Sequence, residues 1–277
     1  MEKTLTLDVL ISTVGNKGLE RAKKVIQQPM DDIRYIISCQ IPDNDTEINV
    51  PDELRDRDDV SVYLINGRGL SKNRNNCLRH SRSDIALIAD DDIEYTPTAF
   101  KDIIECFMNN PSCEIGLFRY SGADNKTYPE GMINVRKKLP GHHYVSSIEI
   151  AIRKCPNTRP LIFDEDFGLG APIFQSGEES LFIWNAIRSG VNIIMFPFVI
   201  CNHQDQTTGL AQIDKPGVLR AQGACMAIMY PLTFIPRVIL NAYYLKKQGR
   251  SFITSMKYMI DGALKVNIIA KRRRPKR

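Results

Sequence analysis

The stretch SRSDIALIADDDIEY, residues 81–95, decides how the rest of the sequence is interpreted. Its centre, residues 85–89, is a short continuous apolar run, which is typical of a strand buried on both faces of a sheet. Three aspartates, Asp90, Asp91 and Asp92, follow this run directly. Two carboxylates about 5 Å apart repel each other by roughly 3 kcal/mol at an effective dielectric near 20. This end of the strand therefore predicts a bound cation or a well-hydrated loop.

The residues on both sides of this run alternate between short apolar segments and helix-like segments. Strands are predicted over 5–13, 33–40, 60–65, 85–89 and 114–120, and helices over 18–28, 69–81 and 97–110. Such alternation indicates an α/β fold, with a mostly parallel central sheet flanked by helices. Ligands of these sheets bind beyond the carboxyl ends of the strands. The three aspartates are therefore expected at the functional edge.

The second half of the sequence is less regular. It predicts a strand over 144–153 packed across the edge of the sheet, a helix over 177–189 and a last strand over 191–200. The composition shifts beyond residue 218. Residues 1–218 are therefore expected to form one α/β domain, and residues 219–277 a helical, basic extension.

Positive charge is concentrated at the end of the sequence. The whole chain carries +5, but residues 246–277 hold eleven Lys or Arg and one acid, so the remaining residues are net negative. This acidic body argues against nucleic-acid binding by the basic tail. The seven cysteines show no zinc-type spacing, which indicates reduced thiols in a cytosolic protein. The strand-like, acidic N-terminus does not look like a secretory signal.

The last sixty residues combine apolar and basic character. Residues 223–245 are strongly apolar, but Pro231, Pro236 and Arg237 interrupt them, so this segment is not expected to span a bilayer. An amphipathic segment and the tail KRRRPKR follow. Together they predict a surface that lies on an anionic membrane, peripheral at the inner face of the cell membrane. The alternative is a helical lobe packed on the sheet, with a solvated basic tail.

Two acidic groups and one histidine carry the candidate chemistry. Asp90 and Asp92 offer oxygen ligands to Mg²⁺ or Mn²⁺, which would then prefer a ligand bearing phosphates. Glu178 and Glu179 open a helix, where the dipole favours negative charge. The spacing of Ser176 and Glu179 fits a helix-capping box, and a general base beside an acceptor hydroxyl is the other interpretation. His203 follows the last strand.

Several well-known motifs are missing from the sequence. It contains no GxxxxGK[ST], no GxGxxG after the first strand, no HExxH and no GxSxG. These absences weigh against a P-loop protein, a dinucleotide-binding Rossmann domain, a zinc protease and an α/β-hydrolase.

The order of the remaining motifs resembles that of the family 2 glycosyltransferases, which have the GT-A fold and invert the anomeric centre. Ser12 and Thr13 end the first strand, GLSKNRNN precedes ADDD, and FDEDFGLGAPIFQSGEESLF is followed by His203. The resemblance covers roughly residues 5 to 205. It is nearest to bacterial enzymes that build surface polysaccharides.

The resemblance implies a role for each matching residue. Asp92 would hold the metal, with Asp90 and His203 near it, and Asp90 would also face the ribose or the donor sugar. Asp91 is usually the least committed of the three. Glu179 would be the catalytic base, and Glu178 would contact the acceptor. The remaining substrate-binding positions would be Ser12, Thr13, Gln40, Arg74 and Asp91, and residues 1–218 would form the nucleotide-sugar-binding and catalytic domain.

Two departures leave questions open. Gln40 stands where the family usually has an aspartate that recognises the nucleobase of the donor. The identity of the donor therefore remains open among UDP-, GDP- and dTDP-sugars. Glutamate replaces the commoner aspartate at the base position, so Glu178 and Glu179 both remain candidates. The expected reaction is metal-assisted sugar transfer, with inversion, to a hydroxyl of a glycan or a lipid-linked acceptor. The alternatives are a haloacid-dehalogenase-type phosphatase and a non-catalytic membrane-surface module.

Overall fold

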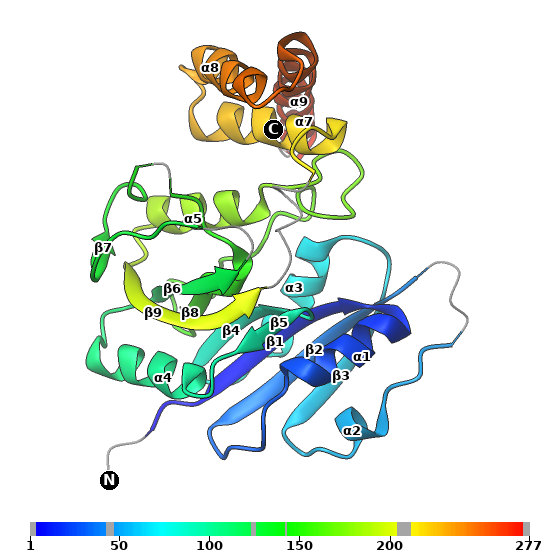
Figure 1. Cartoon of the computed structure of the whole chain (residues 1–277), viewed down its shortest axis with the longest axis vertical. Coiled ribbons are helices and arrows are strands. Elements are labelled where there is room, and N and C mark those ends of the chain that lie inside the picture. Colours follow the sequence, from blue (N-terminus) through cyan, green and yellow to red (C-terminus); the bar gives the residue numbers. More distant parts are fainter. Residues whose placement is uncertain (1–3, 43–46, 123–125, 142, 204–211, 274–277) are drawn as a thin grey trace. The chain divides into compact units, whose positions relative to one another are not determined.

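The computed structural model of the chain describes residues 4–42, 47–122, 126–141, 143–203 and 212–273. The chain forms two compact units (Figure 1). The first comprises Met1–Arg68, Lys72–Phe163 and Phe182–Gln206, and the second comprises Gly69–Ser71, Asp164–Leu181 and Thr207–Arg277.

The first unit is built on one sheet, to which the described residues contribute nine strands in the order β3-β2-β1-β4-β8-β6-β9-β5, with β7 paired to β9 (Figure 1). The first four of that order are parallel to one another, and β6 is parallel to β9. This confirms the predicted mostly parallel α/β sheet. The strands are β1 (Leu7–Val14), β2 (Ile33–Ile41), β3 (Val60–Asn66), β4 (Ile85–Asp90), β5 (Ile93–Tyr95), β6 (Ile115–Gly122), β7 (Ile133–Val135), β8 (Ile150–Arg153) and β9 (Ile193–His203).

The strand expected over 144–153 differs from the prediction in length and place. Only β8 is extended, and it lies between β4 and β6, antiparallel to both, rather than at the edge. The residues before it form a short 3₁₀ helix, η1 (Ser147–Glu149). A capping box explains this turn, because the Glu149 carboxylate accepts a hydrogen bond from the Ser146 N–H at 2.6 Å. The short elements β5, β7 and α2 (Asp52–Arg55) were not predicted.

Helices cover both faces of the sheet. One core contains side chains of α1 (Gly15–Val25) and α4 (Ala99–Asn109), and the other contains side chains of α3 (Leu70–His80) and α5 (Glu178–Arg188). Successive strand residues point to opposite faces, so both faces of a covered strand must be apolar. Strands β1 and β4 are accordingly buried along almost their whole length.

The second unit contains α7 (Pro216–Met229), α8 (Phe234–Lys247) and α9 (Phe252–Arg273). Helices α7 and α9 pack very closely, because a side chain on Gly223 or Gly262 would meet backbone of the other helix within about 2 Å. Pro231 lies in the break between α7 and α8, and Pro236 lies in the first turn of α8, where no N–H is needed. Among the described residues, no helix is long and apolar enough to cross a membrane.

All seven cysteines are free thiols, as the sequence predicts. Six are buried, and Cys155 is half-buried. Burial raises the pKa of the Cys77 thiol to about 12, and it raises the pKa values of Cys106 and Cys113 to about 12 as well. These thiols are therefore protonated and inert at neutral pH.

Candidate active site

The residues predicted to meet the donor gather at the carboxyl ends of neighbouring strands. Ser12 of β1 lies in register with Ser38 of β2 and with Asp90 of β4. Gln40, two residues after Ser38 on β2, lies opposite Val14 of β1 and is also buried. Because parallel strands end at the same edge of a sheet, one edge holds all of these side chains. Their contacts with a donor stay predictions.

Asp90 is held in one orientation by two side chains. Arg74, which is only 2% exposed, donates through Nη2 to Asp90 Oδ1 at 3.0 Å and to the Ser147 hydroxyl at 2.7 Å. The Ser147 hydroxyl in turn donates to Asp90 Oδ2 at 3.2 Å. Ser147 was not predicted, although the S-x-x-E spacing of Ser146 and Glu149 was a readable signal for the turn that carries it. Both oxygens of Asp90 are therefore engaged by the protein.

Asp91 has more partners than the resemblance implies. It is buried, it accepts a hydrogen bond from the Thr13 hydroxyl, and it pairs with Arg21 through Nε at 3.1 Å and Nη2 at 2.8 Å. Burial raises the pKa of Asp91, and the bonds from Arg21 and Thr13 oppose that rise. Asp91 is thus held firmly inside the protein, and its expected minor role toward the donor stays a prediction. Asp91 ties the ends of β1 and β4 to α1.

The close approach of α1 depends on a glycine. A Cβ on Gly18 would lie 2.0 Å from Thr13 Oγ1 and 3.0 Å from Asp91 Oδ2. Only a residue without a side chain fits there, so the Thr13–Asp91 pair and the start of α1 are packed as one piece. Arg21, one turn later on α1, was missed by sequence reasoning, because nothing local marks a partner 70 residues away.

Asp92 is the carboxylate that faces solvent. Its side chain is 44% exposed, and its Oδ1 lies 3.5 Å from Nε2 of His203. The two residues meet because β5 and β9 pair with Ile93 opposite His203. The interaction with His203 lowers the pKa of Asp92. The neighbouring carboxyls of Asp91 and Asp92 thus have pKa values shifted in opposite directions, because burial dominates at Asp91 and the bond from His203 dominates at Asp92.

The side chains around Asp92 supply only part of the ligand shell of a hard divalent cation. Within the described part of the chain, no group of three or more His, Cys, Asp or Glu residues forms a ready-made metal site. Mg²⁺ is usually bound by one or two carboxylates, with waters and substrate phosphates completing its shell. Asp92 and His203 supply one carboxylate and one imidazole, whereas Asp90 is engaged by Arg74 and Ser147. Such a pair suits a cation that arrives with a diphosphate.

Glu178 and Glu179 form the first turn of α5, in the second unit. Glu178 is buried, and Glu179 is partly exposed. Since α5 begins at Glu178, Gly177 with φ 86° takes the cap position. Glycine has no side chain to close a capping box, so the spacing of Ser176 and Glu179 does not match the observed start of the helix. The acceptor and base roles of both glutamates stay predictions.

The loop before α5 is folded firmly on itself. The rings of Phe167 and Phe174 stack with centroids 4.6 Å apart, and the N–H of Gly168 donates to the Phe174 carbonyl at 2.9 Å. The Ser71 hydroxyl donates to the Phe167 carbonyl at 2.6 Å. These contacts join the two ends of the loop segment 167–174 and tie it to the first turn of α3.

A buried ion pair supports η1. The Lys126 ammonium lies 2.5 Å from Glu149 Oε2, and both side chains are almost fully buried. Three tyrosine rings surround the ammonium, with centroids 4.2 to 5.4 Å away, which favours the cation. Burial raises the pKa of Glu149, and the Lys126 charge opposes that rise. Through Glu149, the pair holds the turn that carries Ser147 to Asp90.

Replacing Lys126 by Met is expected to lower the free energy of unfolding by about 3–5 kcal/mol, because it leaves Glu149 buried without a counter-charge. Urea unfolding followed by circular dichroism measures this. The double variant Lys126→Met/Glu149→Gln should recover most of the loss. A carboxyl with a raised pKa is penalised only when ionised, so the deficit of the single variant should shrink as pH falls from about 7.5 to about 5. A single variant as stable as the wild type would contradict this account.

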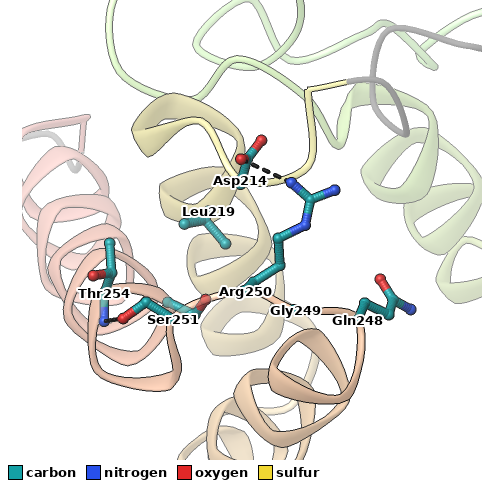
Figure 2. A pocket seen from close by; sticks show the side chains of 8 residues that line it. Asp214, Leu219, Gln248, Gly249, Arg250, Ser251 and Thr254 are labelled. Atoms are coloured by element: carbon teal, nitrogen blue, oxygen red, sulfur yellow. Dashed lines mark hydrogen bonds and ion pairs between the residues drawn. The ribbon is translucent and has the colours of Figure 1, made fainter.

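A separate pocket lies in the second unit, at the turn between α8 and α9 (Figure 2). Its volume is about 480 Å³. An ion pair between Arg250 and Asp214, with atoms 2.8 Å apart, crosses it. No residue of the predicted site lines this pocket; its lining residues are Asp214, Leu219, Gln248, Gly249, Arg250, Ser251, Thr254 and Ser255.

The sheet, with its polar edge at the ends of β1, β2 and β4, defines a glycosyltransferase of the GT-A fold. The chain belongs to Glycosyl transferase family 2, whose model matches residues 18–163. The alternatives of a phosphatase and of a non-catalytic module are thereby set aside. No curated protein sequence matches the chain.

Solved structures agree with this fold. S. aureus TarS 1–349 superposes with a TM-score of 0.57 at 17% identity, covering 80% of this chain and 66% of that one. The same protein in complex with UDP-GlcNAc gives 0.54 at 16%, covering 80% and 67%. The mannosyltransferase PcManGT from Pyrobaculum calidifontis, in complex with GDP-Man and Mn²⁺, gives 0.51 at 15%, covering 96% and 88%. The chain thus spans slightly less than two thirds of TarS 1–349.

Proposed function

We propose that this glycosyltransferase moves a sugar from a nucleoside-diphosphate donor to a hydroxyl of a glycan or lipid-linked acceptor, with inversion and with the help of Mg²⁺ or Mn²⁺. The observation that carries the proposal is the exposed Asp92 carboxylate beside the buried His203, on the same edge as the fixed pair of Arg74 and Asp90. The complexes of TarS with UDP-GlcNAc and of PcManGT with GDP-Man and Mn²⁺ support the donor class.

On the donor side, Asp92 and His203 would hold the cation. When bound, such an ion supplies positive charge that stabilises the leaving diphosphate. Asp90 accepts a hydrogen bond from a hydroxyl of the ribose or sugar, and its orientation is set by Arg74 and Ser147. Because those bonds exist before the donor binds, Asp90 needs no reorganisation.

On the acceptor side, Glu179 takes the proton of the attacking hydroxyl. It is partly exposed, whereas Glu178 is buried, so Glu179 is the glutamate that an incoming acceptor can reach. The start of α5 favours a carboxylate at this position, because the helix dipole is positive there. Attack on the face opposite the leaving group inverts the anomeric centre. A lipid-linked acceptor would also account for a peripheral position at an anionic membrane.

A donor screen tests the proposal. Thermal unfolding is followed with UDP-, GDP- and dTDP-sugars, each with and without Mn²⁺. Sugars of one of the three nucleotides should raise the melting temperature, and more so with Mn²⁺. A ligand that binds only the folded state stabilises it by about 2.7 kcal/mol at one hundred times its Kd. The proposal would be overturned if no donor raised the melting temperature under any condition and no nucleotide were released in the presence of a mixed acceptor pool.

A further inference from the structure

Helix α8 has one buried side and one exposed side, and the exposed side is apolar. The buried side, Val238, Ala242 and Leu245, belongs to a core shared with α7 and α9. The exposed positions repeat at intervals of four, which places them on one face of the helix. This exposed face consists of Ile235, Ile239, Leu240, Tyr243 and Tyr244, and Leu232 in the preceding turn is 97% exposed.

Unbalanced positive charge borders this face. Arg237, Lys246 and Lys247 are exposed, and α8 contains no acidic residue. The Arg237 guanidinium lies 3.7 Å from the centroid of the Tyr230 ring, and Lys247 Nζ lies 4.9 Å from that of Tyr243.

The acids of residues 212–266 do not compensate these cations. There are two of them, and each pairs elsewhere: Asp214 with Arg250, and Asp261 with Arg220 and Lys265. An apolar face beside cations that form no ion pair among the described residues fits a partner that is apolar and anionic at once.

We propose that the exposed face of α8 docks on a lipid bilayer with anionic headgroups. The apolar side chains would enter the boundary between headgroups and acyl chains, and the three cations would contact phosphates. At about 1.5 Å per residue the helix is about 21 Å long, too short to cross a hydrocarbon core of about 30 Å, so it lies flat. Tyr243 and Tyr244 suit this depth, since tyrosine concentrates at membrane interfaces.

Charge argues against a second copy of the chain as the partner. An α8–α8 contact would bring Arg237, Lys246 and Lys247 of one copy against the same cations of the other, with no acid on either helix. Like charges in contact are unfavourable, whereas an anionic lipid surface neutralises them.

The test is sedimentation of the full chain with vesicles of phosphatidylcholine, with and without one quarter phosphatidylglycerol. Binding should require phosphatidylglycerol and should weaken as salt is raised. The variant Lys246→Glu/Lys247→Glu should lose at least roughly 25-fold in partition coefficient, about fivefold for each basic side chain. Its matched control is Lys137→Glu/Lys138→Glu, an adjacent exposed pair in the first unit with the same change of charge.

The apolar contribution is tested with Leu240→Ser, which should lower the partition coefficient about fivefold. Leu64→Ser is its control, because Leu64 is 45% exposed and Leu240 is 52% exposed. Both controls should bind as the wild type does, and thermal melts confirm that all four variants fold.

Three results would overturn the assignment. The first is α8 variants that bind as tightly as the wild type, which would leave another part of the chain responsible. The second is an equal loss of binding in the α8 variants and in their controls, which would show that the loss does not depend on the position of the substitution on α8. The third is a lipid-free dimer that the α8 variants dissociate, which would make the face an interface between copies. No donor is present in this assay, so its outcome is separate from that of the donor screen.

Discussion

Asp92→Asn is expected to reduce metal-dependent sugar transfer by about 10²- to 10³-fold, which is the usual loss when one preorganised charge-stabilising group is removed. The carboxylate is 44% exposed and interacts with His203, so the fold should survive with a change in unfolding free energy within about 0.5 kcal/mol. Initial rates over a range of Mn²⁺ concentrations measure the effect. Higher Mn²⁺ should restore part of the activity.

Two other aspartates serve as comparisons for Asp92. Asp58→Asn removes an exposed carboxylate away from the sheet edge and should leave the rate unchanged. Asp91→Asn removes the buried partner of Arg21 and Thr13, so it should cost about 1–3 kcal/mol of stability. Full activity of Asp92→Asn at low Mn²⁺ would remove Asp92 from the proposed metal site.

Glu179→Gln is expected to lower kcat by about 10²- to 10⁴-fold, the range for loss of a general base. The amide has nearly the same shape, so the Kd of the donor in the presence of Mn²⁺ should stay unchanged when measured by calorimetry.

Glu178→Gln is the matched variant, one residue away in the same turn. Glu178 is buried, so this change should affect stability and acceptor KM more than kcat. If Glu178→Gln loses turnover and Glu179→Gln keeps it, the base assignment is reversed.

The parallel half of the sheet could be predicted because its signals are local. Each of β1, β2 and β4 is rich in apolar residues, and nearly every position on both sides of each strand is buried. The edge that holds Ser12 and Asp90 then follows from parallel register. The position of β8 could not be predicted in the same way, because nothing in a four-residue apolar strand specifies which neighbours it pairs with.

The partners of the site were less predictable than its principal residues. Asp90 and Asp92 are conspicuous in the sequence, but the bonds from Arg21 to Asp91 and from Ser147 to Asp90 join residues about 70 and 57 positions apart. Such pairs depend on how α1 and η1 pack, which is a property of the whole fold. Lys126 was overlooked for the same reason, since its partner Glu149 lies on the far side of β7 in the sequence.

The place of β9 in the sheet has a consequence for how the enzyme matures during synthesis. The N-terminal strands β3, β2, β1 and β4 can pair as soon as residue 90 has emerged, but β5, β6 and β7 all pair with β9. Chains emerge from the ribosome at about 5–20 residues per second, N-terminus first. His203 therefore reaches Asp92 several seconds after that aspartate has been made. A nascent chain halted before Ile193 would have Arg74 and Asp90 in place and would still lack the histidine beside Asp92.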